Sequence, residues 1–161
     1  MKTLYLIRHA KSSWEFDLDD HKRPLNKRGL RDADLIGKQL KTLVKSIDMV
    51  LSSDAERAKT TAKIIFDHLE LPDSIFSLEP TLYDFSGHQV VDVIKNCNDN
   101  IKNLMIFGHN HAFTSIANLY GDKVIDNLPT AGVVGIQFDV KSWKEIEVGK
   151  NVLTLFPKEL R

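Results

Sequence analysis

The stretch LYLIRHAKSSW, residues 4–14, places a basic pair directly after four apolar or aromatic side chains. The run from Leu4 to Ile7 is typical of a strand that is buried on both faces, as in a parallel sheet. Arg8 and His9 follow it without an intervening turn. In α/β proteins ligands bind at the carboxyl ends of parallel strands, so this pair indicates a binding site at that edge of the sheet.

Further short apolar segments along the chain predict the other strands. They occur at residues 49–51, 74–78 and 104–107, and in the tail at 133–140, 143–148 and 152–156. Amphipathic segments that lie between most of these strands predict helices. The alternation is typical of a sheet whose two faces are both covered by helices.

Helix starts are indicated by caps and by apolar repeats. After Asn26, apolar or small residues recur at three- and four-residue spacing: Leu30, Ala33, Gly37, Leu40 and Val44. Capping-box spacings that would start two more helices occur at Ser53 with Glu56 and at Ser86 with Gln89. A fourth helix is predicted over residues 111–120.

These elements predict an α/β fold. We expect a three-layer sandwich with a mostly parallel central sheet and an antiparallel edge made by the last strands. The 161 residues contain no segment with the composition of a linker. We therefore expect a single domain, residues 1–161.

Composition argues against several classes of function. Lys+Arg and Asp+Glu both number 22, so the chain has no overall field that would attract nucleic acid or an anionic membrane. Cys97 is the only cysteine, which excludes an internal disulfide. His88, His109 and His111 lack the spacing of a metal site, so no metal or other cofactor is predicted. The N-terminal apolar run is too short for a signal peptide, and we predict a cytoplasmic protein.

Basic side chains also follow two other strands. Arg57 lies just after the strand at 49–51, and His109 ends the strand at 104–107. Each residue alone has an ordinary structural explanation, but with Arg8 and His9 they converge on one edge. Arginine forks bind the oxygens of a tetrahedral anion, and a neutral histidine is a nucleophile. The combination predicts a phosphoryl site.

Four segments make the sequence resemble a known family. RHA at 8–10, DDHKRPLNKRG at 19–29, SSDAERAKTTA at 52–62 and FGHNH at 107–111 are similar to motifs of the histidine phosphatase superfamily. Its phosphoglycerate-mutase-like members open with Arg-His-Gly, and Ala10 replaces that glycine here. The short length, the RPL segment and the ending LPTAGVVGIQFD resemble the SixA-type phosphohistidine phosphatases.

The resemblance implies a role for each matching residue. His9 would be the nucleophile that becomes phosphohistidine, Arg8 and Arg57 would hold the phosphoryl oxygens, and His109 would hydrogen-bond the same group. Arg23, in RPL, would contact substrate at the rim. Independently of the family, the Ser12 hydroxyl is also close enough in sequence to His9 to touch a phosphate.

The family's proton donor for the leaving group has no clear counterpart. Glu79 and Asp84, in LEPTLYDFSG, are the nearby carboxylates, and an ordinary solvated turn would account for both. We therefore expect hydrolysis through a covalent phosphohistidine, with phosphohistidine on a protein as the substrate. A small phosphorylated metabolite is the alternative substrate. A non-catalytic module that binds phosphate or a phosphopeptide is a third interpretation.

Overall fold

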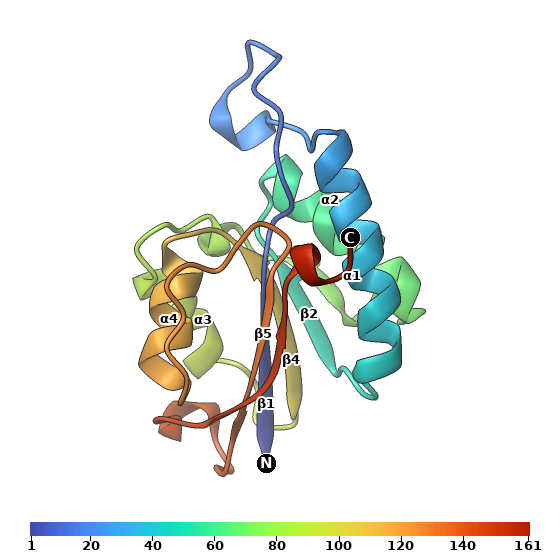
Figure 1. The fold of residues 1–161 in the computed structure, drawn as a ribbon. Helices are drawn as coiled ribbons and strands as arrows, with labels where there is room; N and C mark the ends of the chain where they lie inside the picture. The colour runs from blue at the N-terminus through green and yellow to red at the C-terminus, as the bar shows by residue number, and fades with distance from the viewer.

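The alternating segments of the sequence form one six-stranded sheet in the computed structural model, which describes residues 1–161 (Figure 1). The strands are β1 (Lys2–Arg8), β2 (Met49–Ser52), β3 (Phe76–Leu78), β4 (Asn103–Gly108), β5 (Val133–Phe138) and β6 (Lys150–Leu155). Their order is β3-β2-β4-β1-β5-β6; the first four are parallel, and β5 is antiparallel to both neighbours. The predicted α/β class, with its antiparallel edge, is confirmed.

Helices cover both faces of this sheet. They are α1 (Lys27–Leu43), α2 (Glu56–Leu69), α3 (His88–Lys95) and α4 (Ala112–Tyr120). Figure 1 shows α1 and α2 on one side of the strands, and α3 and α4 on the other, which completes the three layers. None of these helices combines the length and apolar character needed to span a bilayer.

Alternate strand residues enter two separate hydrophobic cores. In β1, Leu4 and Leu6 belong to the core beneath α3 and α4, whereas Ile7 belongs to the core beneath α1 and α2. In β4, Ile106 and Phe107 divide in the same way. Burial on both faces explains why these strands are continuously apolar rather than alternating.

The two predicted capping boxes are wrong, whereas α1 has a side-chain cap that was not predicted. Asn26 caps α1 and accepts a hydrogen bond from the Gly29 amide at 2.8 Å. Ala55, not Ser53, is the N-cap of α2, and Gly87, not Ser86, is that of α3. Both serines match the capping spacing, but each hydroxyl contacts other side chains instead.

Two other expectations are corrected. Leu30 lies on the exposed side of α1 rather than on its buried face. Residues 143–148 do not form a strand: Trp143–Glu145 is a 3-10 turn whose N-cap, Ser142, accepts a hydrogen bond from the Lys144 amide. The buried side chains there, Trp143 and Ile146, are three residues apart, which is the spacing of a helical turn rather than of a strand.

The register of the parallel strands brings their carboxyl ends together. Arg8 of β1 lies opposite Gly108 of β4, and Ser52 of β2 lies opposite Phe107. The residues that follow β1 and β2 stay attached to the sheet, because the His9 amide donates to the Gly108 carbonyl and the Ser53 amide to the Phe107 carbonyl, each at 3.0 Å. Three neighbouring strands therefore deliver their following residues to one site.

Candidate active site

His9 is held rigidly at the end of β1. The residue is 7% exposed, and Nδ1 lies 2.7 Å from the Ala10 carbonyl oxygen. Because a carbonyl only accepts, Nδ1 carries the proton and Nε2 keeps its lone pair. The Ala10 amide in turn donates to Thr61 Oγ1 of α2 at 2.9 Å. His9 thus has the tautomer of a nucleophile, with Nε2 free of protein hydrogen bonds.

The surroundings of His9 also keep it neutral. Burial lowers its pKa to about 3, and the charges of Arg57 and Arg8 act in the same direction against the opposing effect of the Ala10 carbonyl. A protonated imidazole has no lone pair to attack phosphorus. Neutrality at physiological pH is therefore the state that nucleophilic attack requires.

His109 lies beside His9, with ring centroids 5.3 Å apart, and it is completely buried. Its Nε2 lies 2.8 Å from Ser53 Oγ, which also accepts a hydrogen bond from the Ala55 amide. The Ser53 proton has no other acceptor, so the hydroxyl donates to Nε2 and leaves the proton of His109 on Nδ1. Burial lowers the pKa of His109 to about 3, and His9 adds to this effect.

The two predicted arginines converge on the same place from different elements. Arg57, in the first turn of α2, is 2% exposed, and Arg8, the last residue of β1, donates from Nη1 to the Leu128 carbonyl at 2.9 Å. Burial lowers the pKa of Arg8, and the charge of Arg57 adds to this shift. Two guanidinium groups so close together favour an anion between them.

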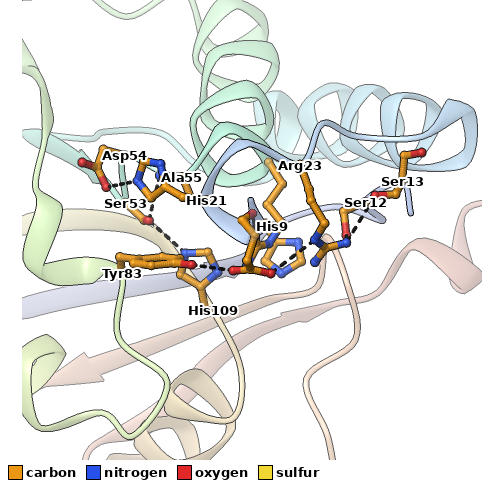
Figure 2. Close-up of polar contacts among 12 residues, drawn as sticks. His9, Ser12, Ser13, His21, Arg23, Ser53, Asp54, Ala55, Tyr83 and His109 are labelled. Atoms are coloured by element: carbon orange, nitrogen blue, oxygen red, sulfur yellow. Dashed lines mark hydrogen bonds and ion pairs between the residues drawn. The ribbon is translucent and has the colours of Figure 1, made fainter. Parts of the chain in front are cut away.

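Arg23 and Ser12 also reach this site, as the sequence predicted. Arg23 is buried, and its Nη1 donates to Ser12 Oγ at 2.8 Å. Its guanidinium stacks on the exposed ring of Trp14, 3.5 Å from the ring centroid. Figure 2 shows the Arg23–Ser12 contact and the Ser53–His109 contact on opposite sides of His9.

His9 and the three arginines line a cavity of about 280 Å³, whereas His109 packs against His9 without lining it. Its lining is mostly polar and consists of Arg8, His9, Lys11, Ser12, Trp14, Asp20, Arg23, Arg57, Phe85, Asn110 and Thr130. The segment between β1 and α1 provides much of this lining. Figure 1 shows that segment projecting beyond the sheet. No group of three His, Cys, Asp or Glu side chains with metal-binding geometry occurs in the molecule.

Buried nitrogen atoms without partners are concentrated at this site. Four buried side-chain N or O atoms in the chain lack a hydrogen-bond partner, and three of them are Arg8 Nε, Arg57 Nε and His109 Nδ1. A buried donor without a partner costs roughly 1–3 kcal/mol. All three belong to residues around His9, so the unpaired buried nitrogens of this chain are gathered beside one side chain.

The two predicted proton donors lie outside the cavity. Glu79 lines a separate groove beside α3. Asp84 accepts hydrogen bonds from the backbone amides that begin α3: Ser86, Gly87, Gln89 and Val90. Burial alone would raise the pKa of Asp84, but the hydrogen bonds from Val90 and Gly87 lower it. Asp84 therefore does the capping that the sequence assigned to Ser86.

Sequence reasoning missed Asp20, which lies in the 3-10 turn Asp20–Lys22. Its carboxylate accepts hydrogen bonds from Arg57 Nη2 at 2.9 Å and from the Tyr83 hydroxyl at 2.5 Å. In the sequence, Asp20 is one of several aspartates that lie close together, a pattern typical of an exposed loop. Only its spacing of three residues from Arg23, which allows an ion pair, could have drawn attention to it. Thr61, beneath Ala10, was also missed.

The structure also accounts for two small residues of the motifs. A Cβ at Gly108 would meet Phe113 Cζ of α4 at 2.6 Å. The small size of Gly108 therefore serves the packing of α4. The methyl group of Ala10 is completely buried in the core beneath α1 and α2 and does not line the cavity, so it does not narrow the site.

Comparison with known proteins agrees with this architecture. The sequence model of the histidine phosphatase superfamily (branch 1) matches residues 4–85, just over half of the chain. The chain belongs to this superfamily. It is therefore a phosphatase. An uncharacterized protein of Mycobacterium tuberculosis is 28% identical over 160 residues, which cover 93% of this phosphatase and 98% of the relative.

Solved structures share the fold of this phosphatase at low sequence identity. The protein histidine phosphatase SixA complexed with tungstate superposes with a TM-score of 0.82, at 22% identity over 99% of both chains. Phosphoserine phosphatase from Entamoeba histolytica, in complex with 3-phosphoglyceric acid, has a TM-score of 0.68 at 16% identity over 100% of both chains. The same architecture therefore occurs in phosphatases with different substrates.

Proposed function

We propose that this phosphatase forms a covalent phosphohistidine on His9 and that its substrate is phosphohistidine on a protein. The observation that carries the proposal is the set of three arginines, Arg8, Arg23 and Arg57, that line one cavity with a histidine whose Nε2 is free. Such donors, fixed before substrate arrives, stabilise charge on phosphoryl oxygens without reorganisation.

The first half-reaction follows from the state of His9. Its neutral Nε2 attacks phosphorus, a P–N bond to His9 forms, and the bond to the leaving group breaks with its electron pair going to that group. The Arg8 and Arg57 guanidinium groups balance the negative charge on the phosphoryl oxygens. His109 donates a hydrogen bond from Nδ1.

The second half-reaction regenerates the enzyme. Water attacks the phosphorus of phosphorylated His9, the P–N bond breaks, and the electron pair returns to Nε2. Inorganic phosphate then leaves with the oxygen and one proton of that water, and the other proton goes to solvent. The same donors serve both steps because the phosphoryl oxygens stay in place.

The lack of a proton donor among the predicted carboxylates favours phosphohistidine. An alkyl ester expels a basic alkoxide, for which general acid catalysis contributes about 10²- to 10⁴-fold. The imidazole of phosphohistidine leaves as a neutral ring when its other nitrogen already carries a proton. Because Glu79 and Asp84 lie away from the cavity, the site suits such a leaving group better.

The rim of the cavity favours a substrate carried by a protein. Trp14 and Phe85 line the cavity, yet they are 77% and 47% exposed, and Phe16 nearby in sequence is also exposed. Exposed aromatic side chains at a site are typical of surfaces that contact proteins. A small phosphorylated metabolite is the second candidate, because a cavity of about 280 Å³ also accommodates one.

A substrate panel tests this proposal. We expect kcat/KM to be highest for a phosphohistidine protein, lower for aryl phosphates and lowest for alkyl phosphates, with activity retained in the presence of a chelator. Glu79→Gln and Asp84→Asn should have mild effects on phosphohistidine, provided that Asp84→Asn keeps its fold by circular dichroism. Efficient alkyl phosphate hydrolysis that collapses in either variant would make that carboxylate the general acid and favour the metabolite.

A further inference from the structure

Asp20 is the only acidic residue that lines the cavity. One oxygen, Oδ2, accepts hydrogen bonds from the Tyr83 hydroxyl and from Arg57 Nη2, at 2.5 and 2.9 Å. The other oxygen, Oδ1, accepts only a longer contact of 3.2 Å from Arg23 Nε. Oδ1 therefore has capacity for another donor. Nothing in the two half-reactions described above uses this carboxylate.

The position of Asp20 is on the leaving-group side of the site. Its side chain is 45% exposed, whereas His9 is 7% exposed. His9 thus lies at the floor of the cavity and Asp20 toward its mouth. In an in-line displacement the leaving group departs opposite the nucleophile, toward the mouth. The departing ring and the Asp20 carboxylate consequently share one end of the cavity.

The partners of Asp20 also fix its chemical state. All three are donors, and two of them are permanently charged guanidinium groups. Burial opposes ionisation, but the hydrogen bonds from Tyr83 and Arg57 hold the pKa of Asp20 at about 2. An ionised carboxylate has no proton to give an alkoxide. It is, however, a strong acceptor for an N–H group that carries positive charge.

We propose that Asp20 accepts a hydrogen bond from the remote N–H of a phosphohistidine ring and so selects phosphohistidine over phosphate esters. This inference rests on the proposed function, because it assigns the leaving group of that reaction. As the P–N bond breaks, its electron pair stays on the ring nitrogen. The remote N–H keeps its proton, the positive charge of the ring is neutralised, and Asp20 stays ionised throughout. Tyr83 acts as a positioning residue that orients Oδ2.

The test compares two leaving groups in wild type and Asp20→Asn. Phosphoimidazole and p-nitrophenyl phosphate are the substrates, and Asp17→Asn is the matched control, since it removes the same charge from the same loop at a residue outside the cavity. For phosphoimidazole we expect kcat/KM of Asp20→Asn to fall about 10- to 100-fold, the range for losing a hydrogen bond to a charged group. The loss on p-nitrophenyl phosphate should be smaller, because this ester has no remote N–H for Asp20 to accept from, and Asp17→Asn should match wild type on both substrates.

Two results would overturn the role of Asp20. Equal losses on both substrates would mean that Asp20 acts only by positioning the arginines, and a larger loss on the ester would make it a general acid. Tyr83→Phe provides a second variant that keeps the carboxylate, and it should lower the activity on phosphoimidazole more than that on the ester. Labelling of His9 in the wild type with ³²P-labelled p-nitrophenyl phosphate separates the two proposals. If His9 is labelled but Asp20→Asn leaves the ratio of kcat/KM for the two substrates unchanged, only the role of Asp20 is rejected. If His9 is not labelled, the phosphohistidine mechanism is rejected.

Discussion

His9 and its neighbours show how individual contacts determine reactivity. The Ala10 carbonyl holds the proton of His9 on Nδ1, and Ser53 holds that of His109 on Nδ1 as well. One histidine consequently presents a lone pair and the other presents a donor, although the two residue types are identical. The sequence predicted that both would reach the site. It could not predict their tautomers, because these depend on a carbonyl and a hydroxyl whose positions are set by the fold.

Substitution of Arg57 by lysine tests whether shape as well as charge matters. Lysine keeps the positive charge but has a single nitrogen. It cannot donate to Asp20 from two nitrogens, as Arg57 does from Nη1 and Nη2, and it has no third nitrogen in place of Arg57 Nε. We expect Arg57→Lys to lower kcat roughly 10²-fold, as for removal of an oxyanion donor. Steady-state kinetics with an aryl phosphate measures this. Lys59→Arg, on the exposed side of α2, is the control, and near wild-type kinetics for Arg57→Lys would place Arg57 outside the site.

Secondary-structure elements were easier to predict from the sequence than their ends were. The strands that carry the site were found because they are continuously apolar, and α1 was found because its apolar residues recur at three- and four-residue spacing. The α3 cap was missed because Asp84 reaches backbone amides as far away as Val90, across a turn that spacing rules do not describe. Residues 143–148 were misassigned because Trp143 and Ile146 suit a strand or a turn equally by composition.

At the scale of elements, Gly108 determines how closely α4 packs on the end of β4. An alanine Cβ would lie 2.6 Å from Phe113 Cζ, so α4 or His109 must shift. We expect Gly108→Ala to lower the free energy of unfolding by about 1–3 kcal/mol, as overpacking does, and to lower kcat as well. Urea denaturation and kinetics measure the two effects. Adding Phe113→Leu should restore part of both; no recovery would show that Gly108 acts in another way.

For the whole molecule, two buried neutral histidines link stability to pH. Above pH 6.5 neither the folded nor the unfolded chain protonates them. Below it the unfolded chain binds protons, whereas folded His9 and His109 do not until about pH 3. Stability is therefore lost as pH falls from 6.5, by about 2 kcal/mol per histidine at pH 5, because the slope is about 1.4 kcal/mol per pH unit.

Urea unfolding at pH 7 and pH 5 measures this linkage. His109→Gln should remove about half of the difference between the two pH values, because only one of the two histidines remains. His68→Gln is the control, since His68 lies outside the cavity and contacts Asp34 on α1. An unchanged pH dependence in His109→Gln would mean that His109 is not held neutral by burial.

The most direct test of the mechanism is to trap phosphorus on His9. Brief reaction with ³²P-labelled substrate, followed by a rapid quench in base and mass spectrometry of peptides, identifies the modified residue. We predict label on His9 that is lost in acid and stable in base, and no label on His9→Ala, which should still bind vanadate. Label that survives acid, label at another residue, or full activity of His9→Ala would contradict the phosphohistidine mechanism.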